Sequence, residues 1–189
     1  RSTSIPPPSI ARGWASSATA GLNYTVAWRR TFDLSETYLI ALGSNRRHRE
    51  HGRPRDVVRA AMEELSALGT VTKRSPVIAS APIGPAQRRF ANAAAELESD
   101  LSPPDLLRAL KAIERGFGRR RGQAWGDRVL DLDIVLWSGG AWDEGDLTLP
   151  HPHFRARGFV LGPACAICAT CRDPFTGLTM RHLHARLTR

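Results

Sequence analysis

Residues 129–137 form an alternating run of apolar and acidic side chains that constrains the fold of this chain more than any other segment. The run is rich in β-branched residues, which favours a strand, and successive side chains on a strand point to opposite faces. Asp131 and Asp133 therefore lie side by side on one face. That face also carries Val129, Val135 and Trp137, and the other face carries Leu130, Leu132, Ile134 and Leu136.

A half-buried pair of carboxylates repels itself and is costly unless a cation lies over it. A hard divalent cation such as Mg²⁺, shared with phosphate oxygens, meets this need. The arginines near the pair suit a polyanion, namely Arg115, Arg119, Arg120, Arg121 and Arg128. Together these residues predict phosphoryl-group chemistry on a nucleotide. The spacing alone leaves a second interpretation, in which local arginines hold the aspartates for structure only.

The composition favours one globular domain with anionic partners. The chain has 189 residues, enough for a domain with a core, and carries a net charge of +9 with a pI of about 10.8. No uninterrupted apolar run approaches the length of a membrane span, so we expect no membrane association. Three cysteines, an odd count near the C-terminus, argue against a disulfide framework and indicate a reducing compartment. We therefore expect a cytoplasmic protein.

Residues 1–36 differ from the rest of the chain, and we expect them to be a largely disordered leader or extension. They contain three consecutive prolines together with several serines and alanines, and they show no clean period. An organelle transit peptide is a second interpretation of this acid-poor segment. Residues 37–189 are then expected to form the single folded domain.

The periodicity of the domain predicts strand, helix, strand, strand, helix and strand in that order. We expect strands at residues 38–42, 71–80, 89–97 and 129–137, and helices at residues 54–68 and 103–113. This order is the ferredoxin-like β-α-β-β-α-β motif, an α+β fold with an antiparallel sheet and helices packed on one face. The last thirty residues are expected to add a short helix, a turn and a final helix.

Residues 125–134, which read W-G-D-R-V-L-D-L-D-I, resemble a motif of the 6-hydroxymethyl-7,8-dihydropterin pyrophosphokinase family of folate synthesis. Further motifs that match the family lie before and after this one, and all occur in the family's order. They are at residues 41–45 (A-L-G-S-N), 90–93 (F-A-N-A), 149–151 (L-P-H) and 157–159 (R-G-F). Several ordered motifs are more specific than one. The resemblance implies the α+β fold and transfer of the β,γ-pyrophosphoryl unit of ATP to the hydroxymethyl group of a reduced pterin, with release of AMP.

The resemblance implies residues for metal and nucleotide. Asp131 and Asp133 match the two aspartates that hold two Mg²⁺ ions in the family. Arg119 and Arg121 match an arginine pair on a mobile loop, and arginine binds phosphate in a bidentate manner. Contacts with ATP are implied for Glu114, Arg128, Ile134, Thr148, His151 and Arg157.

The resemblance also implies a pterin-binding part of the site. Asn92 can offer both a donor and an acceptor to the pyrimidine edge of the pterin. Phe90 and Phe159 match an aromatic pair that sandwiches the ring, although core packing alone would explain both phenylalanines. Further positions beside the pterin match Ser80, Ile83 and Trp125.

Several positions depart from the family's pattern. Asp127 and Pro152 replace a usual proline and a frequent aromatic residue, and Arg88 and Arg89 replace a usual Pro-Asp pair. Asp146 stands where some members have an arginine that touches the nucleotide. These departures concern adenine-side contacts and loop rigidity more than the metal site. They leave open a degenerate homologue that binds nucleotide without turnover.

A non-catalytic nucleic-acid-binding module is the main alternative of a different class, because the ferredoxin-like fold hosts RNA-recognition domains and the chain is basic. The chain lacks the aromatic signature run of those domains, and its aspartate pair would repel a phosphate backbone in the absence of metal. We therefore expect ATP and a reduced pterin as partners, no nucleic acid, and a monomer.

Cys165, Cys168 and Cys171 are spaced as C-x-x-C-x-x-C, a pattern that suggests a metal or an iron–sulfur cluster. No fourth cysteine is present, although His182 or His184 could complete a ligand set. Residues three apart share one face of a helix, and the small apolar neighbours favour packing as the role of these thiols.

Overall fold

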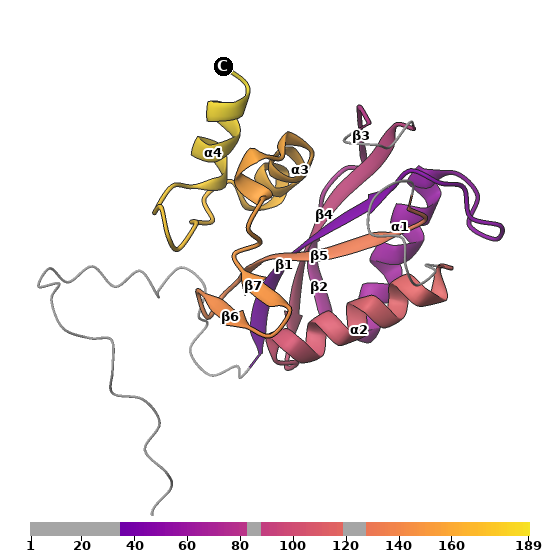
Figure 1. Ribbon diagram of the computed structural model, residues 1–189, viewed down its shortest axis with the longest axis horizontal. Coiled ribbons are helices and arrows are strands. Elements are labelled where there is room, and N and C mark those ends of the chain that lie inside the picture. The colour runs from indigo at the N-terminus through magenta and orange to yellow at the C-terminus, as the bar shows by residue number, and fades with distance from the viewer. Residues whose placement is uncertain (1–34, 83–87, 119–127) are drawn as a thin grey trace, which may run out of the picture.

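The computed structural model describes residues 35–82, 88–118 and 128–189 (Figure 1). Within these ranges the strands are β1 Glu36–Ser44, β2 Thr70–Arg74, β3 Ile78–Ser80, β4 Phe90–Ser99, β5 Asp131–Trp137, β6 Trp142–Glu144 and β7 Leu147–Leu149. The helices are α1 Pro54–Glu64, α2 Pro103–Gly116, α3 Gly158–Cys168 and α4 Met180–Leu187, with 3₁₀ turns η1 Leu65–Ala67 and η2 Phe154–Ala156. None of these helices is long and apolar enough to cross a lipid bilayer.

The main sheet is antiparallel and has the strand order β2-β4-β1-β5, with β3 also paired to β4. Because β4 lies between β1 and β2, the connection through α1 crosses over β4. The connection through α2 likewise crosses over β1 to reach β5. This is the ferredoxin-like arrangement, so the predicted α+β fold is confirmed.

The two faces of the main sheet are covered by different helices (Figure 1). α1 and α2 bury a first core against one face, whose residues include Ile40, Leu42, Val58, Leu97, Leu106 and Leu132. η2, α3 and α4 bury a second core against the other face, whose residues include Leu39, Ala94, Val135, Leu136, Leu161 and Met180. The expectation of helices on one face therefore holds for α1 and α2 only. α3 is apolar around most of its circumference, and such a helix must be buried.

A β-bulge in β5 changes the predicted alternation of its last residues. Ile134 pairs with Ile40 and Leu136 pairs with Leu39, which leaves Val135 as an extra residue. Beyond a bulge the side chains exchange faces. Leu136 consequently lies in the second core rather than beside Ile134, and Trp137 packs against the first core rather than beside the aspartates. The expectation for Asp131 and Asp133, which precede the bulge, is unaffected.

The predicted strand at residues 71–80 is divided into β2 and β3. Pro76 lies between them, and proline cannot donate a hydrogen bond to a neighbouring strand. Ser75 compensates at this point, because its N–H donates to Ala94 O at 2.9 Å and its Oγ accepts from Ala94 N–H at 2.8 Å. β3 is therefore a separate short strand, and its last residue, Ser80, lines the cavity described below.

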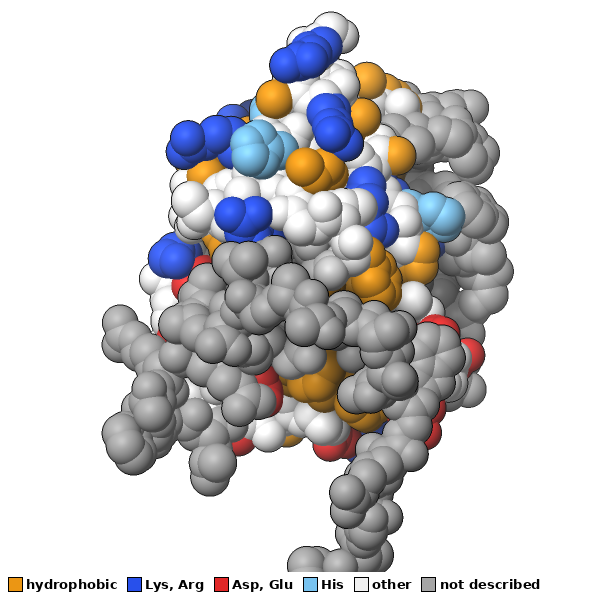
Figure 2. All heavy atoms as spheres, turned by 90° about the vertical axis from the view of Figure 1, so that its left-hand side faces the viewer, with side chains coloured by type: hydrophobic (Ala, Val, Ile, Leu, Met, Phe, Trp, Pro, Cys, Tyr) orange, Lys and Arg blue, Asp and Glu red, His pale blue; other side chains and the backbone are white. Residues whose placement is uncertain are grey.

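The surface toward the C-terminus is basic. On the face shown in Figure 2, lysine and arginine side chains gather at one end, and acidic side chains lie toward the other. Exposed arginines in and before α4 are Arg172, Arg181 and Arg186. Part of the positive net charge of the chain therefore lies on this C-terminal surface.

Candidate active site

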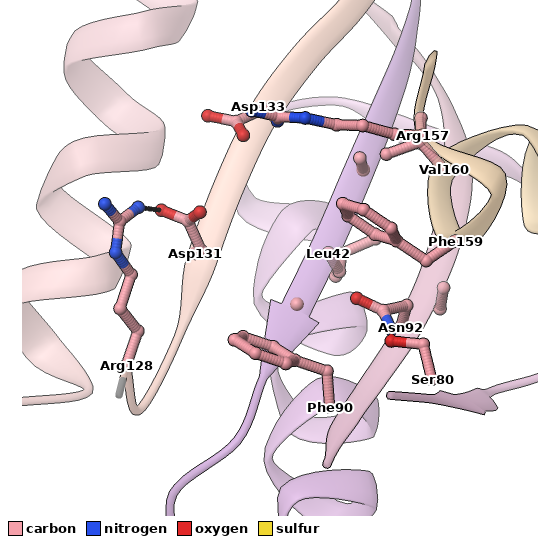
Figure 3. Close-up of a pocket in the computed structure, with 13 residues that line it drawn as sticks. Leu42, Ser80, Phe90, Asn92, Arg128, Asp131, Asp133, Arg157, Phe159 and Val160 are labelled. Carbon is pink, nitrogen blue, oxygen red and sulfur yellow. Dashed lines mark hydrogen bonds and ion pairs between the residues drawn. The ribbon is translucent and has the colours of Figure 1, made fainter. Parts of the chain in front are cut away.

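An open cavity lies on the face of the sheet that carries α3 (Figure 3). β1, β3, β4 and β5 supply its floor, and the first turn of α3 supplies one wall. The sequence-predicted residues that line it are Ser80, Phe90, Asn92, Arg128, Asp131, Asp133, Arg157 and Phe159. Segments more than seventy residues apart in the chain are thus brought to one place by the strand order.

Asp131 and Asp133 lie on the cavity face of β5, as the alternation predicts. Their partners on β1 are Gly43 and Ala41, so the neighbouring strand has no large side chain beside the carboxylates. The Asp131 and Asp133 side chains are 25% and 32% exposed. The small neighbours therefore leave the carboxylates half-buried and open to the cavity.

Among the described residues, three basic side chains from three different segments lie within 4 Å of an aspartate oxygen. Arg128 Nη1 contacts Asp131 Oδ1 at 2.5 Å. Lys111 Nζ and His151 Nε2 lie 3.8 and 3.9 Å from the two oxygens of Asp133. The positive charges of Arg128 and Lys111 at these distances reduce the repulsion between two carboxylates on one strand face. The sequence left open an interpretation in which an arginine holds the aspartates for structure only. The Arg128–Asp131 ion pair is present, but both residues also line the cavity.

His151 is oriented by its own segment of backbone. Its N–H donates to Val135 O at 3.0 Å, and its Nδ1 accepts from His153 N–H at 3.1 Å. Burial, aided by Arg157 and His153, lowers the pKa of His151 below its ordinary value, against the opposing effect of Asp133. The neutral ring then carries its proton on Nε2, the nitrogen that faces Asp133. His151 is therefore a neutral donor beside Asp133.

Asn45 is a site-shaping residue for which the sequence reasoning gave no role. Its side chain is buried, and its Oδ1 accepts from Arg128 N–H at 2.6 Å. Asn45 N–H donates in turn to Arg128 O at 3.0 Å. These two hydrogen bonds fix the backbone from which the Arg128 side chain reaches Asp131. The signal in the sequence was the G-S-N run that ends the first predicted strand.

Two aromatic rings flank an amide at the other end of the cavity (Figure 3). Asn92 is 4% exposed, and its Nδ2 donates to Ser80 Oγ at 2.9 Å, which orients the amide. Phe90 and Phe159 are only partly buried, and the Arg157 guanidinium lies 5.9 Å from the centre of the Phe159 ring. Partly exposed rings on either side of an oriented amide can hold a flat polar heterocycle.

Four residues expected at the nucleotide do not line this cavity, although one of them, His151, lies 3.9 Å from Asp133. Glu114 is fully buried in α2, and Ile134 is buried in the first core. Thr148 is exposed on β7, where its Oγ1 donates to Asp143 Oδ1 at 3.0 Å. Contacts of these residues with ATP stay predictions. Four further expected residues lie outside the described residues: Ile83, Arg119, Arg121 and Trp125.

The loop between β1 and α1 contains His48, Glu50 and His51, whose ligand atoms lie within 4.8 Å of one another. His48 Nδ1 already accepts from the N–H groups of Glu50 and His51, each at 3.2 Å. The His51 ring also stacks on Phe117, at the end of α2, with ring centroids 4.7 Å apart. These contacts close the loop and attach it to α2, so they account for the cluster without a metal.

The cysteines of the C-terminal region are free thiols. Cys168 is buried in the second core, and Cys171 packs against that core. A hydrogen bond with Cys171, together with burial, raises the pKa of the Cys168 thiol. This environment agrees with the packing role expected from the sequence.

Residues 39–169 match the family model described as 7,8-dihydro-6-hydroxymethylpterin-pyrophosphokinase (HPPK). This chain belongs to that family. Among its relatives is the 2-amino-4-hydroxy-6-hydroxymethyldihydropteridine pyrophosphokinase of Pseudomonas aeruginosa, 42% identical over 138 residues that cover 71% of this chain and 82% of the relative. The Bacillus subtilis protein of the same name is 39% identical over 130 residues, covering 68% and 76%.

Longer proteins contain a similar unit. The mitochondrial folate synthesis bifunctional protein of Arabidopsis thaliana is 35% identical over 78% of this chain, which corresponds to 26% of the plant protein. A crystal structure of Plasmodium falciparum HPPK-DHPS has a TM-score of 0.63 at 11% identity, covering 80% of this chain and 43% of that one. This likeness to a distant structure supports the fold alone. The chain spans less than half of either protein.

Proposed function

We propose that this member of the HPPK family transfers the pyrophosphoryl group of ATP to 6-hydroxymethyl-7,8-dihydropterin in folate synthesis. The hydroxymethyl oxygen attacks the β-phosphorus of ATP, and a new bond forms between them. The bond from the β-phosphorus to the oxygen shared with the α-phosphorus breaks, so AMP leaves and the hydroxyl proton is lost. The two substrates are both small molecules.

One observation carries the proposal. A single cavity contains a carboxylate pair with basic groups at one end and an oriented amide between partly exposed aromatic rings at the other. The first end suits a metal-bound triphosphate, and the second suits a flat pterin ring. A nucleic-acid-binding module has no need for this combination. Among the described departures from the family's pattern, Arg88, Arg89, Asp146 and Pro152 do not line the cavity.

The residues present fit a divalent cation. Asp131 and Asp133 offer partly exposed carboxylate oxygens from one strand face at the cavity, and this is the donor type that Mg²⁺ prefers. Bound there, Mg²⁺ would neutralise charge on the triphosphate. We infer that the two aspartates hold the two ions expected for the family.

The chain's own residues would bind and orient the two substrates. Arg128, Arg157 and His151 can donate to phosphate oxygens from two sides of the aspartate pair, as the Arg157 side chain in Figure 3 extends toward Asp133. Asn92 can pair with the pyrimidine edge of the pterin, and Phe90 and Phe159 can stack on its faces. We retain the sequence-based roles of Arg119, Arg121, Trp125, Ile83, Glu114, Ile134 and Thr148 as part of this proposal.

The test is AMP formation from ATP, measured with and without hydroxymethyl-dihydropterin and with and without Mg²⁺. We expect AMP only when both are present, in an amount equal to the pterin diphosphate formed. A degenerate homologue would bind a non-hydrolysable ATP analogue in the presence of Mg²⁺ yet form no AMP. AMP formation that is independent of pterin would instead indicate a nucleotide hydrolase and contradict the proposed acceptor.

A further inference from the structure

Leu132, in the edge strand β5, has both backbone polar groups held by side chains from outside the sheet. Leu132 N–H donates to Glu114 Oε1 at 2.8 Å, and Leu132 O accepts from Lys111 Nζ at 2.9 Å. β5 lies at the edge of the main sheet, where outward-facing backbone groups have no neighbouring strand. Two side chains of α2 therefore satisfy the backbone of Leu132 in place of a strand.

The two side chains that hold Leu132 also bind each other. Lys111 Nζ donates to Glu114 Oε1 at 2.7 Å, and the residues are three apart in α2. Glu114 is 0% exposed, whereas the Lys111 side chain is 31% exposed. A fully buried carboxylate is expensive unless charge and hydrogen bonds compensate it, and a buried ion pair often contributes little net stability. Such a pair therefore indicates a role in fixing one geometry.

The residue that is held lies between the two aspartates. Because Leu132 separates Asp131 from Asp133, the position of its peptide groups sets the direction and separation of the two carboxylates. The Lys111 ammonium group also lies 3.8 Å from Asp133 Oδ1. Lys111 thus contacts both the backbone of this segment and one of its carboxylates.

We propose that Lys111 and Glu114 are positioning residues that hold the Asp131–Asp133 segment of β5 in the geometry that binds divalent cations. The inference rests on the proposed cation-binding role of the aspartates and assigns a new role to Lys111. It also assigns Glu114 the role of holding the Leu132 backbone, in addition to the nucleotide contact expected from the sequence. If the pair served only to attach α2 to the sheet, its loss would lower stability without changing cation binding by the folded protein.

The first test measures hydrogen exchange of the Leu132 amide in the full chain without metal or nucleotide. Glu114→Ala removes the acceptor, so exchange should accelerate by about tenfold or more, the value of one hydrogen bond. Glu114→Gln retains an acceptor oxygen and should stay near the wild-type rate. Unchanged exchange in Glu114→Ala would overturn the positioning role. If Glu114→Ala does not fold, Lys111→Met tests the same role through the binding of Mg²⁺, as described next.

The second test measures the Mg²⁺ concentration that half-saturates binding of a non-hydrolysable ATP analogue. Lys111→Met should raise this concentration by about fivefold or more, and Lys111→Arg, which keeps a donor for Leu132 O, should restore most of the loss. The chain has only one other lysine, Lys73, which pairs with Glu96 at 3.0 Å on β4. Lys73→Met is therefore a matched control and should bind Mg²⁺ like the wild type.

The outcomes separate this inference from the function on which it rests. An unchanged or lowered Mg²⁺ requirement in Lys111→Met would overturn the positioning role, and a lowered one would make Lys111 a competing charge. If Asp133→Ala binds Mg²⁺ and the analogue as the wild type does, the proposed metal site fails. In that case the exchange result still decides whether Lys111 and Glu114 hold the strand.

Discussion

Glu114 and Asp173 are both fully buried carboxylates paired with a basic side chain, yet they lie in different surroundings. Glu114 lies under β5 and contacts the backbone between the candidate metal ligands. Asp173 lies in the loop between α3 and α4, among residues that do not line the cavity. A buried carboxylate paired with a basic side chain therefore supports the candidate site in one region and only the local fold in the other.

The hydrogen bonds of the two carboxylates differ in kind. Both oxygens of Asp173 accept from Arg155, at 2.6 and 2.7 Å, and they also accept from Thr176 Oγ1 and Phe175 N–H. Burial alone would raise the pKa of Asp173, but these hydrogen bonds outweigh burial and hold it below its ordinary value. The partners of Asp173 thus close a loop, whereas those of Glu114 reach across to a neighbouring strand. We expect mutations to separate the two regions.

The largest expected effect is on catalysis. Asp133→Ala should lower the rate of AMP formation by about 10³-fold or more, since it removes a group proposed to hold charge at the reacting phosphates. Its melting temperature should equal or exceed that of the wild type, because a source of carboxylate repulsion is gone. The measurements are AMP formation and thermal unfolding without ligands. An active variant that melts earlier would make the aspartate pair structural and remove the contrast with Asp173.

Asp173→Ala should show the opposite pattern. Loss of this buried partner leaves Arg155 without its fork of acceptors, and breaking a buried pair costs about 3 kcal/mol or more. We expect a lower free energy of unfolding in urea, with turnover per folded molecule close to that of the wild type. Arg172→Ala is a control on the same loop, since its side chain is exposed. A selective loss of turnover at full stability would place Asp173 in the site.

A smaller effect is expected within the cavity, at the end away from the aspartates. Asn92→Ala should raise KM for the pterin by about tenfold, because one oriented amide is lost, and leave binding of ATP unchanged. Ser80→Ala should have a lesser effect, because it removes the acceptor that orients Asn92 but leaves the amide itself in place. Steady-state kinetics with each substrate varied in turn provide the measurement. Equal effects on ATP and pterin would contradict the division of the cavity into two ends.

The smallest effects concern the pH dependence of stability. The depressed pKa of Asp173 contributes stability that is present above its unfolded pKa, about 3.9, and is lost as pH falls through the folded pKa. The depressed pKa of His151 means that the unfolded chain binds a proton first, so stability should already decline as pH falls below about 6.5. Asp173→Asn should flatten the acidic limb, and His151→Gln the limb near pH 6, in urea unfolding at each pH. Unchanged limbs would contradict these assignments.

Local pattern was sufficient for most of the fold and for much of the candidate site. Alternation at residues 129–137 placed Asp131 and Asp133 on one face, and the order of periodic segments gave the ferredoxin-like arrangement. Helical spacing gave the buried faces of α1 and α2, where Val58 and Leu106 lie in the first core. Each of these features depends on the regular repeat of a strand or a helix, and this repeat is visible in the sequence as the periodicity of apolar residues.

The tertiary structure alone decided which distant groups meet. The bulge at Val135 depends on the pairing of β5 with β1 and moves Leu136 and Trp137 to opposite cores. Lys111 and Glu114 are three residues apart in α2 and pair with each other, but their hydrogen bonds to Leu132 arise only when α2 packs along β5. Periodicity assigns residues to faces, whereas the contacts of an edge strand depend on which element covers that edge.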